Sequence, residues 1–306
     1  MRSAGTQAAL RRPESVDRAA EPALAAEAHG VTAGGAKLTE RLAVTSGMNS
    51  HYRWPDALWI VRHGESAGNL ARDQAHAARR PIIDIAERDV DVPLSSLGEE
   101  QAASLGRWFA DLPAERRPNV VLCSPYLRAR RTAEIVRDAG GLDPACEAFA
   151  IDERLREKEF GVVDRLTSLG IRERLPGEAK RRADLGKFYY RPPGGESWCD
   201  VILRLRSALD TISLHHAGDR VLIVAHQVVV LCLRYLIEGM TEEQILAVDR
   251  EGDVANCSIT SYRFDPAAAG HGGNGGLVLD RYNFVAPLEA EATPVTAEPD
   301  RPVATR

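Results

Sequence analysis

Cysteine, long apolar runs and net positive charge are all scarce in this chain, and each shortage excludes a class of protein. The 306 residues include five cysteines without Cys-x-x-Cys spacing, which excludes a disulfide framework and a cysteine zinc site and predicts a reduced, cytoplasmic chain. The longest apolar stretch, residues 221–233, is interrupted by His226 and Gln227 and is too short to span a membrane. A net charge of −5 leaves no overall basic field to attract nucleic acid or a membrane surface. We therefore expect neither as a partner.

Aromatic residues are missing from both ends of the chain. The first 50 positions hold twelve alanines and no Phe, Trp or Tyr, and residues 285–306 hold four prolines and again no aromatic. Such segments bury too little apolar surface to offset the entropy of ordering. We expect disordered tails at residues 1–56 and 286–306, with one domain at residues 57–285 between them. Met48, just ahead of the first expected strand, is an alternative start of the chain.

Strand and helix signals alternate through the central region. Strands are expected at residues 58–61, 119–123, 148–151, 220–225, 256–264 and 277–285, and helices at 99–110, 127–137, 198–215 and 229–238. This alternation predicts an α/β fold, a three-layer αβα sandwich with a mostly parallel central sheet. Two polar stretches, residues 70–93 and 162–196, fit no periodic pattern and are expected to be lids or binding loops.

The first expected strand ends in Arg62 and His63, at the edge where open α/β sheets bind ligands. Neutral imidazole is nucleophilic near pH 7, and a guanidinium fork can grip two phosphate oxygens. The pair therefore suits attack on a phosphoryl group. A second apolar strand ends in His226. A lone histidine in that position is more often structural, but two strand tips of this kind can converge on one site.

Further charged residues follow the same edge. Arg128 lies in the first turn of a helix after a strand, where helix N–H groups also attract anions; for Arg130 or Arg131 a solvated helix face is the better explanation. Phosphoryl transfer also needs a proton donor for the leaving group and then a base for water. Glutamates at positions 153, 157 and 159 are candidates, and these residues alone do not choose among them, since each is equally explained as surface charge.

Six blocks follow one another along the chain: Arg62–Ser66 with Asn69, Pro93–Ala102, Ser124–Ala129 with Thr132 and Ala133, Leu155–Glu157 with Gly161, Gly195–Ser197, and Val224–His226. Together they closely resemble the histidine phosphatase superfamily, also called the phosphoglycerate mutase-like fold. The resemblance spans about residues 57–264, nearly all of the expected domain.

The resemblance implies a role for each matching residue. His63 would be the nucleophile that forms a phosphohistidine, and Glu157 would be the acid and then the base. Arg62, Arg128 and His226 would surround the phosphoryl oxygens. Asn69, Ser66 and Gln227 would bind substrate, and no metal or cofactor is implied, because arginines do the electrostatic work that Mg²⁺ does in kinases.

Within the superfamily, the phosphatase branch fits better than the mutase branch. Gly68 stands where the mutases have a tryptophan, and residues 70–93 lack their Phe-Thr-Gly-Trp stretch. The chain looks most similar to the fructose-2,6-bisphosphatase branch, notably at residues 187–197, although Ser168 replaces a substrate-binding tyrosine of that branch. The implied activity is that of a metal-independent phosphoric monoester hydrolase of the histidine acid phosphatase type, acting on small phosphorylated metabolites. A cofactor-dependent phosphoglycerate mutase and a non-catalytic binding protein are the alternatives.

A basic segment at residues 180–191 bears on substrate choice. It carries Lys180, Arg181, Arg182, Lys187 and Arg191 against the single acid Asp184. A solvated loop explains the first two. Lys187 and Arg191 flank three aromatic residues that would anchor the loop, so we expect them, with Arg182, to attract a second anionic group of the substrate.

Overall fold

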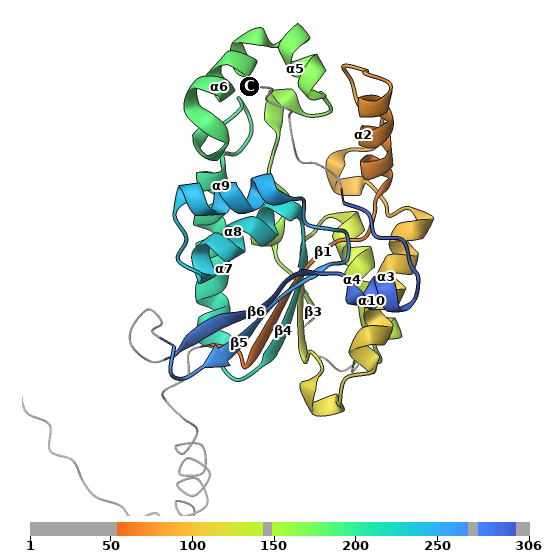
Figure 1. Ribbon diagram of the computed structural model, residues 1–306, viewed down its shortest axis with the longest axis vertical. Coiled ribbons are helices and arrows are strands. Elements are labelled where there is room, and N and C mark those ends of the chain that lie inside the picture. The colour runs from red at the N-terminus through yellow and green to blue at the C-terminus, as the bar shows by residue number, and fades with distance from the viewer. Residues whose placement is uncertain (1–53, 143–148, 269–274, 298–306) are drawn as a thin grey trace, which may run out of the picture. The chain divides into compact units, whose positions relative to one another are not determined.

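The computed structural model describes residues 54–142, 149–268 and 275–297 (Figure 1). The tail expected at the N-terminus lies outside the described residues up to position 53. Trp54 and its neighbours already belong to the domain, because Pro55 is buried and the N–H of Asp56 donates to the carbonyl of Asp219 over 2.8 Å.

The described strands form one six-stranded sheet in the order β3-β2-β4-β1-β5-β6. Their bounds are β1 Ala57–Arg62, β2 Val120–Cys123, β3 Phe149–Ile151, β4 Arg220–Ala225, β5 Ile259–Asp265 and β6 Gly276–Phe284. Strands β1 to β4 run parallel, whereas β5 is antiparallel to both of its neighbours. Arg62 is paired with Ala225, so β1 and β4 end level. This confirms the mostly parallel α/β fold and brings the tips that carry His63 and His226 together.

Helices cover both faces of the sheet (Figure 1). One face carries α7 Trp198–His215, α8 Gln227–Ile237 and α9 Glu242–Glu251, and the other carries α3 Ser96–Ala110, α4 Leu127–Ala139 and α10 Ala286–Ala290. The side chains of β1 alternate between the two faces. Leu58 and Ile60 pack in the hydrophobic core under α7, α8 and α9, whereas Val61 packs in the core under α3, α4 and α10. Successive side chains of a strand point to opposite faces, so a strand buried on both faces must be apolar throughout.

The two polar stretches were expected to be irregular, and that expectation is wrong for residues 70–77 of the first stretch and for most of the second, which are helical. They contain α2 Ala67–Ala77, α5 Ser168–Arg174 and α6 Pro176–Tyr189. Local caps start these helices: Ser66 and Asn69 form a capping box for α2, Thr167 caps α5, and Pro176 occupies the first turn of α6. All three helices lie beyond the strand tips, over the edge where ligands bind (Figure 1).

The expected C-terminal tail is also wrong for residues 286–297. Helix α10 places Leu288, which is 0% exposed, in the core beneath α3 and α4. Beyond α10, Glu291 pairs with Arg107 of α3, and Thr296 is hydrogen bonded to Asn256. An alanine- and proline-rich composition misled the prediction because a few long-range contacts order this segment. Residues 298–306 lie outside the described residues.

Within the described ranges, no helix is both long and apolar enough to cross a bilayer. The four cysteines described there, Cys123, Cys199, Cys232 and Cys257, are free thiols.

Candidate active site

His63 has its tautomer fixed by two neighbours. Its Nδ1 lies 2.7 Å from the carbonyl oxygen of Gly64, and its Nε2 lies 3.2 Å from the Nε of Arg128. A carbonyl can only accept a hydrogen bond and a guanidinium can only donate one. Nδ1 therefore carries the proton, and Nε2 presents its lone pair.

The environment also keeps this imidazole neutral. Burial lowers the pKa of His63 well below its ordinary value, and the positive charges of Arg128 and Arg62 lower it further, while the hydrogen bond to Gly64 acts in the opposite direction. A neutral imidazole with a directed lone pair is the form that attacks phosphorus.

Glycines let the chain around His63 approach α3 closely. A Cβ on Gly64 would lie 2.4 Å from the carbonyl oxygen of Gly98, and a Cβ on Gly98 would lie 2.0 Å from that of Glu65. No other residue fits at either position. The N–H of Gly64 donates to Thr132 of α4 over 3.1 Å. These contacts give physical reasons for Gly98 and Thr132 in the second and third blocks of the resemblance.

Two buried arginines stand beside His63. Arg62 Nη1 donates to the carbonyl of Val254, and Arg128 Nη1 lies 3.0 Å from Oδ1 of Asp89. The two arginine residues are only 4% and 5% exposed. Fixed cations of this kind can offset the charge of a phosphoryl group without rearrangement.

His226 lies beside His63 but is completely buried. Their ring centroids are 5.1 Å apart, and His226 Nε2 is 2.7 Å from the hydroxyl of Ser124 at the tip of β2. Burial and the charge of Arg128 lower the pKa of His226 well below its ordinary value, with smaller contributions from His63, Arg204 and Arg62. The convergence of two strand-tip histidines is therefore present in the structure.

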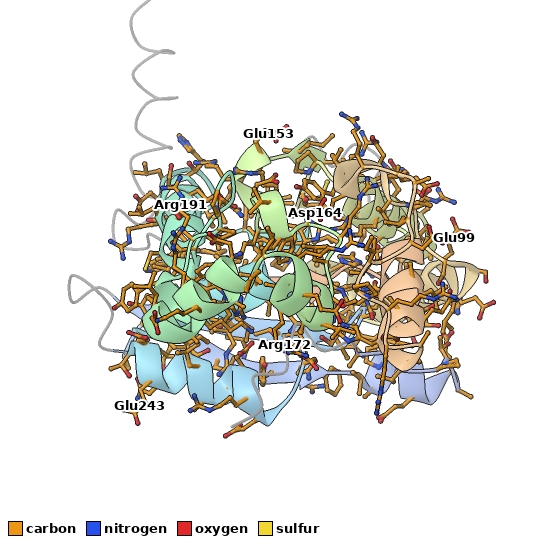
Figure 2. All side chains as sticks on the ribbon, turned by 90° about the horizontal axis from the view of Figure 1, so that it is seen from above. Glu99, Glu153, Asp164, Arg172, Arg191 and Glu243 are labelled. Atoms are coloured by element: carbon orange, nitrogen blue, oxygen red, sulfur yellow. The ribbon has the colours of Figure 1, made fainter. Side chains whose placement is uncertain are left out.

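Of the three candidate glutamates, only Glu157 is buried and lines the cavity. Its Oε2 lies 3.8 Å from Nδ1 of His226. Glu153 is exposed at the edge of the molecule (Figure 2), and Glu159, also exposed, accepts a hydrogen bond from the Tyr126 hydroxyl over 3.0 Å. By its position, Glu157 is therefore the best placed of the three glutamates to act as the proton donor.

Arg204 of α7, which sequence reasoning missed, holds the segment that carries Glu157. It donates to the carbonyls of Glu157 and Arg154 over 3.2 and 2.6 Å, and its other N–H groups bind both carboxylate oxygens of Glu196. Gly161, with φ of +56°, lets this segment pass the backbone near Pro193. No local sequence pattern predicts the pair of Glu196 and Arg204. The two residues are eight positions apart, and α7 begins between them.

Most of the predicted site residues line a single cavity. It is lined by every predicted site residue except His226 and Arg191. Asn69 lies at the first turn of α2, where its Oδ1 accepts hydrogen bonds from both the N–H and the hydroxyl of Ser66. Three lining cations escaped the sequence analysis: Arg72, Lys158 and Arg165. Their neighbours in sequence are mixed in character, so no pattern singled them out.

The expected cationic loop is corrected in two respects. Lys187 lies in α6 and lines the cavity, but its Nζ is 2.7 and 2.8 Å from the two carboxylate oxygens of Asp249 in α9. Arg191 donates to the carbonyl of Gly195 over 3.1 Å and lies well apart from Asp164, which lines the cavity (Figure 2). The two cations do not converge. Arg182 does line the cavity, with its guanidinium over the ring of Tyr190.

Among the residues that the structure describes, no three His, Cys, Asp or Glu side chains gather as a metal ion would require.

The model of the histidine phosphatase superfamily (branch 1) matches residues 58–270. The chain belongs to this superfamily. It is 34% identical over 206 residues to the probable phosphoglycerate mutase GpmB of Erwinia tasmaniensis, a match that covers 66% of this chain and 82% of that relative. The superfamily resemblance inferred from the six blocks is thereby confirmed.

Two solved phosphatase structures share the fold. A mycobacterial glucosyl-3-phosphoglycerate phosphatase in complex with VO3 superposes with a TM-score of 0.55 at 23% identity, over 75% of this chain and 99% of that one. The α-ribazole phosphatase of Shigella flexneri gives a TM-score of 0.56 at 21% identity, over 74% and 97%.

Proposed function

We propose that this histidine phosphatase is a metal-independent phosphomonoester hydrolase that acts through a phosphohistidine on small phosphorylated metabolites. The observation that carries the proposal is the state of His63: neutral, with Nδ1 bonded to Gly64 and the Nε2 lone pair beside two buried arginines. We place the reaction in the cytoplasm, in keeping with the free thiols.

The chemistry takes two steps. The Nε2 lone pair of His63 forms a bond to phosphorus while the bond between phosphorus and the ester oxygen breaks, and protonated Glu157 gives its proton to the leaving oxygen. Water then attacks the phosphohistidine, the Glu157 carboxylate takes a proton from that water, and the N–P electron pair returns to His63. Arg62 and Arg128 bind the phosphoryl oxygens in both transition states.

The cavity supports a small substrate. Beyond the arginines of the reaction centre, its wall combines the cations Arg72, Lys158 and Arg165 with apolar side chains such as Ile83 and Val163. Mixed walls of this kind are usual for metabolite sites. The two phosphatases compared above, one named for glucosyl-3-phosphoglycerate and the other for α-ribazole, share this fold.

The mutase alternative rests on the name of the curated relatives. Incubation with 3-phosphoglycerate, with and without 2,3-bisphosphoglycerate, separates the two activities. The phosphatase proposal predicts release of inorganic phosphate. Interconversion of 2- and 3-phosphoglycerate without phosphate release would favour the mutase.

The direct test is phosphate release from p-nitrophenyl phosphate and a panel of sugar phosphates by the full chain. We expect His63→Ala to abolish turnover and His215→Ala, at the exposed end of α7, to leave it unchanged. Activity should survive EDTA. Turnover in His63→Ala, or an EDTA loss that Mg²⁺ or Zn²⁺ restores, would contradict the proposal, and an inactive wild type would favour a binding protein.

A further inference from the structure

Two buried side-chain amides hold the backbone on either side of Gly64. Asn256 Nδ2 donates to the carbonyl of His63 over 2.9 Å, and Gln101 Oε1 accepts from the N–H of Glu65 over 2.9 Å. Both side chains are 0% exposed. Neither lines the cavity, so both act on the nucleophile through its backbone.

A single residue of the C-terminal segment, residues 291–297, contacts both amides. The Thr296 hydroxyl accepts from Gln101 Nε2 over 2.9 Å and lies 3.1 Å from Asn256 Oδ1, to which it donates. The carbonyl of Thr296 accepts from the N–H of Asn256 over 2.8 Å. Next to it, the carbonyl of Pro294 accepts a second hydrogen bond from Gln101 Nε2 over 2.9 Å.

The hydroxyl of Thr296 meets the end of each amide that points away from the backbone around Gly64. A carboxamide can turn over with little change in shape, so its orientation depends on its partners. The carbonyl of His63 can only accept, so the NH₂ group of Asn256 faces it, and Thr296 donates to the oxygen that is left. The N–H of Glu65 can only donate, so the oxygen of Gln101 faces it, and Thr296 and Pro294 accept from the NH₂ group. Without the hydroxyl, the oxygen of Asn256 loses this donor, and a buried acceptor without a donor is unfavourable.

We propose that Thr296 is a positioning residue for phosphoryl transfer: the C-terminal segment holds Asn256 and Gln101 in place, and these hold the backbone that aims His63. The inference rests on the proposed function, since it concerns the rate of that reaction. The superfamily match ends at residue 270, so the segment that carries Thr296 lies outside the matched part of the chain. Geometry matters here because displacement of a reacting atom by about 1 Å can cost roughly a hundredfold in rate.

The test replaces the hydroxyl without changing the shape of the side chain. Thr296→Val should lower kcat on p-nitrophenyl phosphate by about tenfold and leave KM nearly unchanged, because the arginines that bind the substrate are untouched. Thr296→Ser, which keeps the hydroxyl, should restore most of kcat. Thr293→Val is the matched control, since its hydroxyl lies 2.8 Å from that of Ser104 and away from the nucleophile; it should keep the wild-type kcat.

A second measurement does not depend on activity. Amide hydrogen exchange of the full chain should be faster in the peptide covering residues 63–66 in Thr296→Val than in Thr293→Val. A wild-type kcat in Thr296→Val, an equal loss in Thr293→Val, or no recovery in Thr296→Ser would overturn the proposal. If the wild type releases no phosphate, the proposed function fails on its own, and exchange at residues 63–66 alone then decides the positioning role.

Discussion

Arg128 Nε donates a hydrogen bond to Nε2 of His63 over 3.2 Å, so a cation covers the lone pair of the proposed nucleophile. The same guanidinium is tethered through Nη1 to Asp89 of the cavity wall. In the proposed reaction, an incoming phosphoryl group takes the place of this hydrogen bond. Arg128 then holds a phosphoryl oxygen where it had held the lone pair.

The first prediction concerns the shape of that cation. Arg128→Lys keeps the charge but loses the planar fork, and we expect kcat/KM on p-nitrophenyl phosphate to fall roughly 100- to 1000-fold. Arg131→Lys is the matched control on the same helix, because Arg131 is half exposed and paired with Glu99. Near-wild-type activity in Arg128→Lys would show that a point charge suffices.

The second prediction concerns pH. Because burial, Arg128 and Arg62 lower the pKa of His63 well below its ordinary value of 6.5, the imidazole stays neutral and nucleophilic as pH falls through 6.5. The pH profile of kcat/KM with p-nitrophenyl phosphate should therefore stay flat from pH 8 to about 6.5 and below. An acid limb centred near 6.5 would mean that His63 titrates as an ordinary histidine. Arg128→Gln should move the acid limb upward.

The third prediction separates the glutamates. Glu157→Gln should lose roughly two to four decades of rate on an alkyl phosphate, the usual contribution of a general acid. The loss should be smaller with p-nitrophenyl phosphate, whose leaving group needs little protonation. Glu153→Gln and Glu159→Gln, both exposed, are the controls and should stay active. Equal losses of Glu157→Gln on the two substrates would count against an acid role.

The fourth prediction reassigns Lys187 from substrate binding to the stability of the fold. Its ion pair with Asp249 is largely buried, with side chains 20% and 8% exposed. Lys187→Met should lower the free energy of unfolding in urea by about 1–3 kcal/mol because it leaves a buried carboxylate without its cation, and adding Asp249→Asn should recover part of the loss. Lys180→Met breaks the exposed pair with Asp184 and should cost less than about 1 kcal/mol. Loss of substrate affinity without loss of stability in Lys187→Met would contradict this assignment.

The residues of the proposed catalytic core were predictable because their signals are local. Arg62, His63 and His226 each follow an apolar strand directly, and strands that pair in register bring their tips together. Arg128 was found in the same way, from a helix that starts just after a strand. The position of Glu157 required the resemblance, since three glutamates of equal local character stand within seven residues.

What the sequence analysis missed has two different causes. Helix α9 begins with a capping box, Thr241 with Gln244, so a local signal existed and was overlooked. The order of residues 291–297 and the Lys187–Asp249 pair depend instead on partners far away in sequence. No local pattern encodes the bond between Thr296 and Asn256, so composition alone suggested a tail.

The most direct test of the account is chemical trapping of the phosphoenzyme. The full chain is mixed briefly with a ³²P-labelled substrate, quenched in base and digested. We predict label that is stable in base and labile in acid, on the peptide that contains His63, and no label in His63→Ala. Turnover without any label at His63, or label on another residue that persists in His63→Ala, would contradict the account.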